Sequence, residues 1–136
     1  MLFASREFQK SAMQVDKQVN AADRVVILSV SGELGDSDLL SLAIDIENDP
    51  EVKPDFSMLV DVRRADVRNV TSAGVRALAD RPLALSPASR RGIVVPSELG
   101  FGMARVYEAL RNAESGAIRV FRDYEEAQRW VATGAL

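Results

Sequence analysis

Residues 58–60 read Met58-Leu59-Val60, a short run that is apolar at every position. Such a run is typical of a central strand in a parallel sheet, because helices cover that strand on both faces. A second run, Ile93-Val94-Val95, has the same character and ends at Pro96. The two runs predict a sheet in the middle of the molecule with helices packed against it.

Helices are predicted on either side of these strands by apolar residues at helical spacing. Asp36 or Ser37 is the predicted N-cap of one helix, which carries a buried stripe at positions i, i+3, i+4 and i+7: Leu39, Leu42, Ala43 and Ile46. A second helix begins at Thr71 or Ser72 and stops before the next proline. Two more helices are predicted, one over 98–112 and one with Tyr124, Ala127 and Val131 inward.

Strands near the two ends of the chain complete the pattern. Residues 13–19 and 24–31 are strand-like and are separated by a hairpin loop, and residues 117–121 form the last strand. The expected order is β-β-α-β-α-β-α-β-α. This is an α/β fold with a mixed, mostly parallel sheet, in which right-handed crossovers join the later strands and the opening hairpin adds an antiparallel edge. The 136 residues fit one domain, 1–136, in which 1–12 is expected to be weakly ordered.

The composition argues against several classes of protein. A formal net charge of −3 disfavours nucleic-acid binding, because neutralising phosphates supplies most of that affinity. No apolar run approaches the roughly 18 residues of a membrane span, and the first residues lack the order of a secretory signal. The sequence has no cysteine, which suits a reducing compartment. We therefore expect a cytoplasmic protein without a membrane span.

Charge is distributed unevenly along the chain. Nine acidic residues and one lysine lie from Glu33 to Asp61, whereas seven arginines and two aspartates lie from Arg63 to Arg91. The simpler interpretation is a set of solvated faces whose charges partly pair with each other. The alternative is a basic surface that receives an acidic partner or an anionic ligand.

Most residue types that carry out catalysis are missing. Without histidine or cysteine the chain has no Ser-His-Asp triad, no cysteine nucleophile and no imidazole or thiolate metal ligand. No lysine follows a glycine-rich loop, and Gly100-Phe101-Gly102 lacks the third glycine of a dinucleotide fingerprint. Asp61 and Asp66 could form a polar site with Ser72, or Asp61 could cap a loop or pair with an arginine. We therefore expect that the chain is not an enzyme and that it binds neither a cofactor nor a metal ion.

Four short motifs follow one another at a characteristic spacing: Val30-Ser31-Gly32-Glu33-Leu34, Leu59-Val60-Asp61, Val70-Thr71-Ser72-Ala73-Gly74-Val75, and Phe121 with Glu126-Ala127. In this order the chain, from about Val15 to Trp130, resembles the STAS domains of bacterial anti-sigma-factor antagonists and of the cytoplasmic tails of sulfate transporters. It is most similar to a branch of uncharacterised bacterial proteins described as SpoIIAA-like. The resemblance implies the STAS (SpoIIAA-like) fold and a regulatory protein that binds partners.

The resemblance extends to a phosphorylation motif. In the antagonists of this family the second helix begins with Asp-Ser-Ser-Gly, and a partner kinase phosphorylates the second serine. Here the motif is Thr71-Ser72-Ala73-Gly74, so Ala73 takes the acceptor position and cannot be phosphorylated. Ser72 or Thr71 is either a displaced acceptor or an ordinary N-cap whose hydroxyl satisfies a backbone N–H. We therefore expect the usual serine phosphoswitch to be absent.

These features predict a non-enzymatic module that binds an unknown protein partner or a second copy of itself. The expected binding surface is the start of the second helix with the loop before it: Asp61, Arg68, Thr71, Ser72, Gly74 and Arg76. Arg68 and Arg76 are the expected charged anchors, because arginine forks onto carboxylates and loses less than lysine on desolvation.

An alternative function follows from a distant likeness of this branch to the CRAL-TRIO lipid carriers, whose sheet and helices enclose a hydrophobic ligand. By that likeness the chain would bind a lipid or another apolar small molecule. Methionine and aromatic side chains suit such a site, and the expected pocket residues are Leu99, Phe101, Met103, Tyr107 and Trp130. The same residues at helical spacing are also explained as ordinary core, which is the simpler interpretation.

Overall fold

The computed structural model describes residues 12–82, 84–96, 98–112 and 117–135. Within these ranges the elements follow the order that the sequence predicts. They are β1 (Gln14–Asn20), β2 (Val25–Glu33), α2 (Asp36–Glu47), β3 (Ser57–Asp66), α3 (Ser72–Ala79), β4 (Arg91–Val94), α4 (Glu98–Asn112), β5 (Ile118–Phe121) and α5 (Tyr124–Thr133). The predicted weak order of 1–12 lies outside the described residues except at Ala12, which forms a bridge with Glu33.

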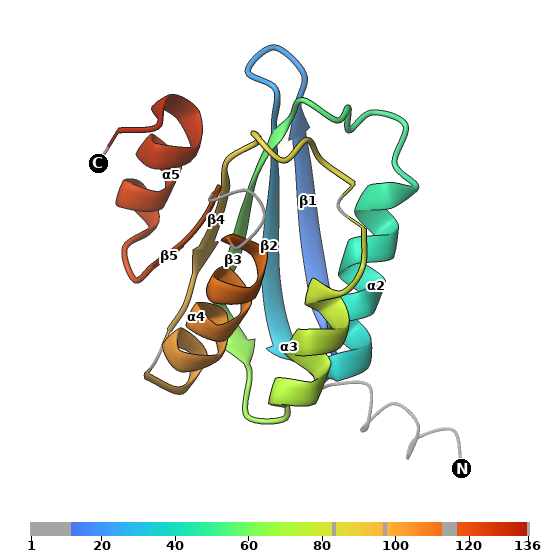
Figure 1. The fold of residues 1–136 in the computed structure, drawn as a ribbon, viewed down its shortest axis with the longest axis vertical. Coiled ribbons are helices and arrows are strands. Elements are labelled where there is room, and N and C mark those ends of the chain that lie inside the picture. The colour runs from blue at the N-terminus through green and yellow to red at the C-terminus, as the bar shows by residue number, and fades with distance from the viewer. Residues whose placement is uncertain (1–11, 83, 97, 113–116, 136) are drawn as a thin grey trace.

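The strands of the described residues form one mixed sheet in the order β1-β2-β3-β4-β5 (Figure 1). β1 and β2 are an antiparallel hairpin, with Gln14 opposite Ser31 and Asn20 opposite Val25. β2, β3, β4 and β5 run parallel to one another. The predicted sheet, mostly parallel with an antiparallel edge, is therefore confirmed.

Among the described residues, helices cover both faces of this sheet, three on one face and one on the other. α2, α3 and α4, which connect neighbouring parallel strands, pack on one face, and α5 packs on the opposite face. Side chains alternate accordingly along β3: Met58 and Val60 face the three helices, whereas Leu59 packs with Trp130 of α5. Crossovers of one hand between adjacent strands place their helices on the same face, which leaves the other face to the last helix.

The packing between α5 and the sheet is close. Leu59 and Val94 are 1% and 0% exposed on this face, where they form a cluster with Trp130 and Val131. Gly92 of β4 permits this approach, because a Cβ atom there would lie 2.9 Å from a methyl group of Val131. Trp130 therefore lies on the face of the sheet opposite α4. The prediction that it shares a pocket with residues of 98–112 is wrong.

β3 is longer than the apolar run from which it was predicted. Its last pair with β4 joins Asp61 to Val94, but it continues to pair with β2 as far as Asp66. Asp61, which the sequence placed at the exit of the strand, therefore lies in its middle. The run Met58-Leu59-Val60 marked only the part of β3 that pairs with a strand on each side.

Candidate functional site

Side-chain hydrogen bonds join the starts of α2 and α3. Gly35, and not Asp36 or Ser37 as predicted, is the N-cap of α2, and its N–H donates to Asp38 Oδ2 at 2.8 Å. The Asp36 carboxylate is left for α3: it accepts from the Thr71 hydroxyl at 2.6 Å and from the Thr71 N–H at 2.8 Å. These two hydrogen bonds hold the pKa of Asp36 below its ordinary value.

Thr71 also caps α3. Its hydroxyl oxygen accepts from the N–H of Gly74 at 3.1 Å, as the capping interpretation predicts. Gly74 is buried, and a Cβ atom there would overlap the carboxyl group of Asp36. Since the Thr71 hydroxyl is both donor and acceptor, a phosphate on it would break the link between α2 and α3.

The two predicted anchor arginines differ in their surroundings. Arg68 forks onto Asp66, with Nε donating to Oδ1 at 3.0 Å and Nη2 to Oδ2 at 2.7 Å, and this pair lowers the pKa of Asp66 to about 2. Arg76 and Ser72 are exposed on α3. Arg76 forms no ion pair with any residue that the structure describes. Arg76 is therefore the better placed of the two to meet a partner.

Asp61 lies apart from this surface. It is 9% exposed and accepts from Nε and Nη2 of Arg63, both at 2.9 Å, and Arg63 lies over the Tyr124 ring of α5. Burial alone would raise the pKa of Asp61, but the hydrogen bonds from Arg63 outweigh it and hold the pKa below its ordinary value. Ser72 is on α3, across the sheet, so Asp61, Asp66 and Ser72 do not form the polar site considered above. Pairing with an arginine explains Asp61.

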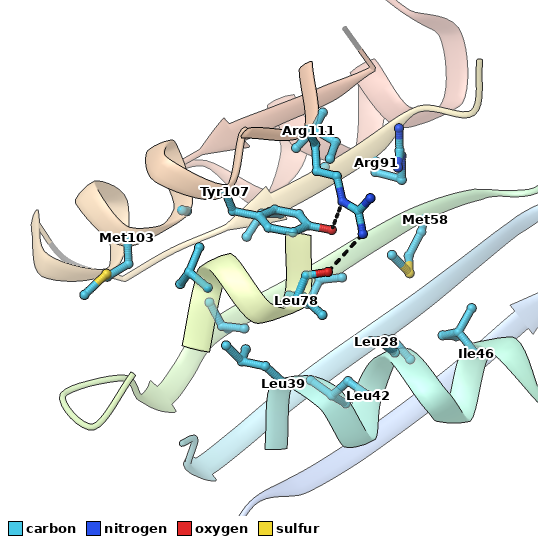
Figure 2. A pocket seen from close by; sticks show the side chains of 18 of the residues that line it. Leu28, Leu39, Leu42, Ile46, Met58, Leu78, Arg91, Met103, Tyr107 and Arg111 are labelled. Carbon is cyan, nitrogen blue, oxygen red and sulfur yellow. Dashed lines mark hydrogen bonds between the residues drawn. The ribbon is translucent and has the colours of Figure 1, made fainter. Parts of the chain in front are cut away.

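A second candidate site is an apolar cavity of about 200 Å³ between the sheet and the helices α2, α3 and α4 (Figure 2). The strands line one side of this apolar cavity with Leu28, Met58, Val60 and Ile93. The helices line the other with Leu39, Leu42, Ile46, Leu78, Met103 and Tyr107. The stripe predicted for α2 thus lines the cavity, and Ile46 is also buried in a cluster with Val26 and Leu28.

The apolar cavity is reflected in the burial of the two central strands. Val60 of β3 and Ile93 of β4 face it and are only half-buried, whereas Leu59 and Val94, their neighbours on the α5 face, are almost fully buried. Helices normally cover both faces of a parallel sheet, and protein interiors are close-packed. Around Val60 and Ile93, the face under α2, α3 and α4 is therefore covered without being filled.

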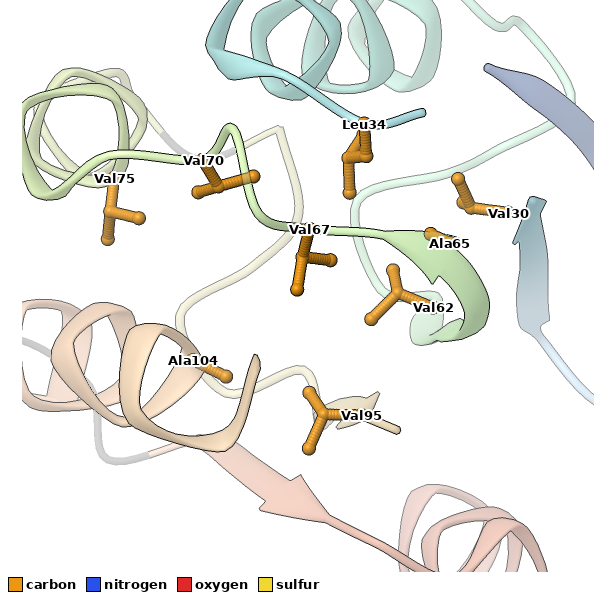
Figure 3. Packing of buried hydrophobic residues seen from close by; sticks show 9 residues of the cluster. All are labelled: Val30, Leu34, Val62, Ala65, Val67, Val70, Val75, Val95 and Ala104. Atoms are coloured by element: carbon orange, nitrogen blue, oxygen red, sulfur yellow. The ribbon is translucent and has the colours of Figure 1, made fainter. Parts of the chain in front are cut away.

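Close packing returns at the end of the cavity nearest the start of α3 (Figure 3). Leu34 after β2, Val67 and Val70 before α3, and Ala104 of α4 are buried there in one cluster. All four of these residues also line the cavity. The hydrogen-bonded starts of α2 and α3 thus lie over a solid part of the core that borders the cavity.

The other end of the cavity carries charge. Arg81 and Glu47 form an ion pair there at 2.8 Å, and their side chains are 32% and 30% exposed. Arg91 and Arg111 are each 4% exposed. The polar lining of the described residues therefore holds three arginines and one glutamate, in a wall that is otherwise almost entirely apolar.

Arg111 ties α4 to the C-terminal end of α3. Its Nη2 donates to the carbonyl oxygens of Leu78 and Arg81 at 3.0 and 2.6 Å, and its Nε donates to the Tyr107 hydroxyl at 3.3 Å (Figure 2). The last carbonyls of a helix lack partners within the helix and carry the negative end of its dipole. Arg111 therefore stabilises the end of α3 across the cavity.

Sequence reasoning found part of this lining. Met103 and Tyr107 line the cavity. Phe101 does not; it lies under the guanidinium of Arg122 at 4.4 Å. The side chain of Leu99 is outside the described part of the structure.

The charged end was missed by sequence reasoning, although a signal for it exists. Arg111 follows Met103 and Tyr107 on the same helix at i+8 and i+4, so continuing the stripe by one more turn would have included it. No comparable signal identifies Val60 and Ile93, because an apolar run looks the same whether a core or a cavity covers it.

Neither a metal site nor a membrane span is found in the part of the chain that the structure describes. No three acidic side chains lie together there in the way that a metal ion requires. None of the helices described is both long and apolar enough to cross a bilayer.

Similarity to known proteins is limited to the fold. No family model matches the chain, and no curated protein sequence does either. The crystal structure of an uncharacterised DUF3478-family protein with a SpoIIAA-like fold, from Shewanella loihica PV-4, matches with a TM-score of 0.55 at 17% identity, over 88% of this chain and 94% of that chain. An anti-sigma factor antagonist from Mycobacterium paratuberculosis gives 0.48 at 15% identity, over 89% and 95%. The first match shows that this chain has the predicted SpoIIAA-like fold.

We expect Arg68→Gln to raise the pKa of Asp66 from about 2 toward its ordinary value of 3.8, because the fork of Arg68 is the main cause of the lowering. An NMR titration of the Asp66 carboxyl group measures this, and Asp36, which depends on Thr71 instead, is the internal control. A lowered carboxyl pKa stabilises the folded state above the ordinary value. The stability difference between the two proteins should therefore vanish as the pH falls through about 2. An Asp66 that titrates normally in the unchanged protein would contradict the fork.

Val→Ala substitutions on the two faces of the sheet should lower the free energy of unfolding by different amounts. Val94→Ala opens a hole in a close-packed face, so the free energy of unfolding should fall by roughly 2–3 kcal/mol. Val60→Ala only enlarges a space that exists already and removes fewer contacts, so its cost should be about 1 kcal/mol smaller. Denaturant unfolding measures both. Equal costs would mean that the face under α2, α3 and α4 is filled.

Proposed function

We propose that this chain is a non-enzymatic binding module that takes a small apolar molecule into the cavity between the sheet and the helices α2, α3 and α4. The observation that carries the proposal is the half-burial of Val60 and Ile93 in the two central strands, where they face about 200 Å³ of space. Apolar cavities of roughly 150 Å³ are known to stay dry and to bind benzene or xenon. This cavity is larger, and most of its lining is apolar.

The contacts that the lining residues lack also support a ligand. A molecule that fills the cavity would supply those contacts, and the dispersion attraction gained would favour the bound state.

Neutral apolar probes test this proposal. Benzene and 1-octanol should raise the melting temperature, with a stabilisation of roughly 1.4 kcal/mol at about ten times the Kd. Ala43→Leu, whose side chain would extend from α2 into the cavity, should abolish the shift. The matched control is Ala77→Leu on the exposed side of α3, which should keep it. The proposal is wrong if no probe stabilises the protein, or if Ala43→Leu responds as the unchanged chain does.

The surface at the start of α3 supports a second candidate function, the docking of a protein partner or of a second copy of the chain. Ser72, Ala73 and Arg76 are exposed there, and Arg76 has no ion-pair partner among the described residues. Thr71 holds the start of the helix to α2 and so fixes the shape of this surface. STAS domains, which the sequence resembles, act by binding partners in the cytosol. With Ala73 at the acceptor position, docking would proceed without the usual serine phosphoswitch.

Charge reversal at Arg76 tests the docking surface. If a partner binds there through an acidic group, Arg76→Glu should weaken its capture by at least about tenfold while the melting temperature stays unchanged. The control is Arg129→Glu, which reverses an exposed charge on α5, across the sheet. Affinity capture from the native host, quantified for the unchanged chain and both variants, measures the effect. Equal loss in both variants would point to net charge alone, and no loss in either would remove this surface from consideration.

A further inference from the structure

The charged end of the apolar cavity gives the chemical class of the ligand. Resting on the proposed function, we infer that the cavity binds a monocarboxylic acid, with its apolar body between the sheet and α2, α3 and α4 and its carboxylate on the guanidinium of Arg111.

Arg111 is a buried cation whose hydrogen-bond partners among the described residues are all neutral. It is 4% exposed, and its hydrogen bonds go to the carbonyl oxygens of Leu78 and Arg81 and to the Tyr107 hydroxyl. These bonds use Nε and Nη2. A guanidinium has five N–H donors, and Nη1 donates to none of the described residues.

A buried charge of this kind is normally paired with a counter-ion. Removing a cation from water is expensive, and neutral acceptors recover only part of the loss. The carbonyls at the end of α3 explain why a donor lies here, because they need one. They do not explain why the donor carries a full charge deep in an apolar wall. An anion from outside the chain would do so.

The acidic side chain in this wall is already engaged. Glu47 accepts Arg81 Nη2 at 2.8 and 2.9 Å and Arg81 Nε at 3.3 Å, at the partly exposed rim. It forms no ion pair with Arg111. Among the described residues, no carboxylate therefore neutralises Arg111.

The dimensions of the site favour a carboxylate with a body of moderate size. With Nε and Nη2 of Arg111 engaged, the two N–H groups of Nη1 remain to donate to a carboxylate. Scaled from roughly 150 Å³ for a cavity that holds benzene, about 200 Å³ has room for about eight carbon atoms. Octanoate therefore suits the cavity as a probe, and 1-octanol is its neutral counterpart of equal chain length.

Titration calorimetry with these two probes at neutral pH tests the inference. The unchanged chain should bind octanoate about tenfold or more tightly than 1-octanol, because a charge-assisted hydrogen bond adds to the same apolar contact. Arg111→Gln should bring octanoate down to the affinity of 1-octanol and change 1-octanol by less than about twofold. The matched control is Arg105→Gln on the same helix, where Arg105 is exposed and pairs with Glu108 at 3.0 Å. It should leave both affinities unchanged.

A second measurement covers the case in which Arg111→Gln does not fold. In the unchanged chain, octanoate should shift the side-chain Nε–H NMR signal of Arg111, and 1-octanol should leave it in place. If 1-octanol binds as tightly as octanoate, the carboxylate inference is overturned while the apolar binding function stands. If neither probe binds, both are overturned. Tighter binding of octanoate together with a shifted Arg111 signal supports both.

Discussion

Two adjacent central strands that are apolar on both sides impose the main constraint on this protein, because each face of the sheet must then be covered. α5 covers one face closely. α2, α3 and α4 cover the other, and side-chain bonds hold them in place at both ends. Asp36 joins the starts of α2 and α3 through Thr71, and Arg111 joins the end of α3 to α4. The apolar cavity lies between these two sets of bonds, so the helices are held over the sheet without closing onto it.

Much of the fold could be predicted from the sequence, because it depends on local periodicity. Apolar runs and helical stripes gave the order of elements, and Thr71 was correctly placed as a cap. The positions of Asp61 and Trp130 depend instead on how far β3 pairs with β2 and on which face α5 occupies. Those are tertiary properties. The face of α5 could still have been inferred, since crossovers of one hand between adjacent strands put the three connecting helices together.

The candidate site was less predictable than the fold, and for a physical reason. Periodicity shows which side of a helix faces inward, but it does not show whether the inward space is filled. Leu42 and Val60 have the residue types of any core, and only their half-burial reveals the cavity. The chemistry absent from the sequence was more informative. A chain without histidine or cysteine has no imidazole or thiol to place at a site.

The two candidate functions share α3. This helix has eight residues; Val75 and Leu78 line the cavity, while Arg76 is exposed on the outer surface. A molecule that presses on the inner side of so short a helix acts on the element that carries the outer surface. Occupancy of the interior and recognition at the exterior would then be thermodynamically linked, and each would favour or oppose the other to the same extent.

The unequal covering of the sheet also bears on how such a protein can diverge. The half in which α5 lies against β3 and β4 has a close-packed apolar cluster of its own. Substitutions among the inward residues of α2, α3 and α4 can therefore reshape or recharge the interior while leaving that half intact. Descendants of one ancestral chain could keep the same architecture and still differ in what they accommodate, with little sequence identity left between them.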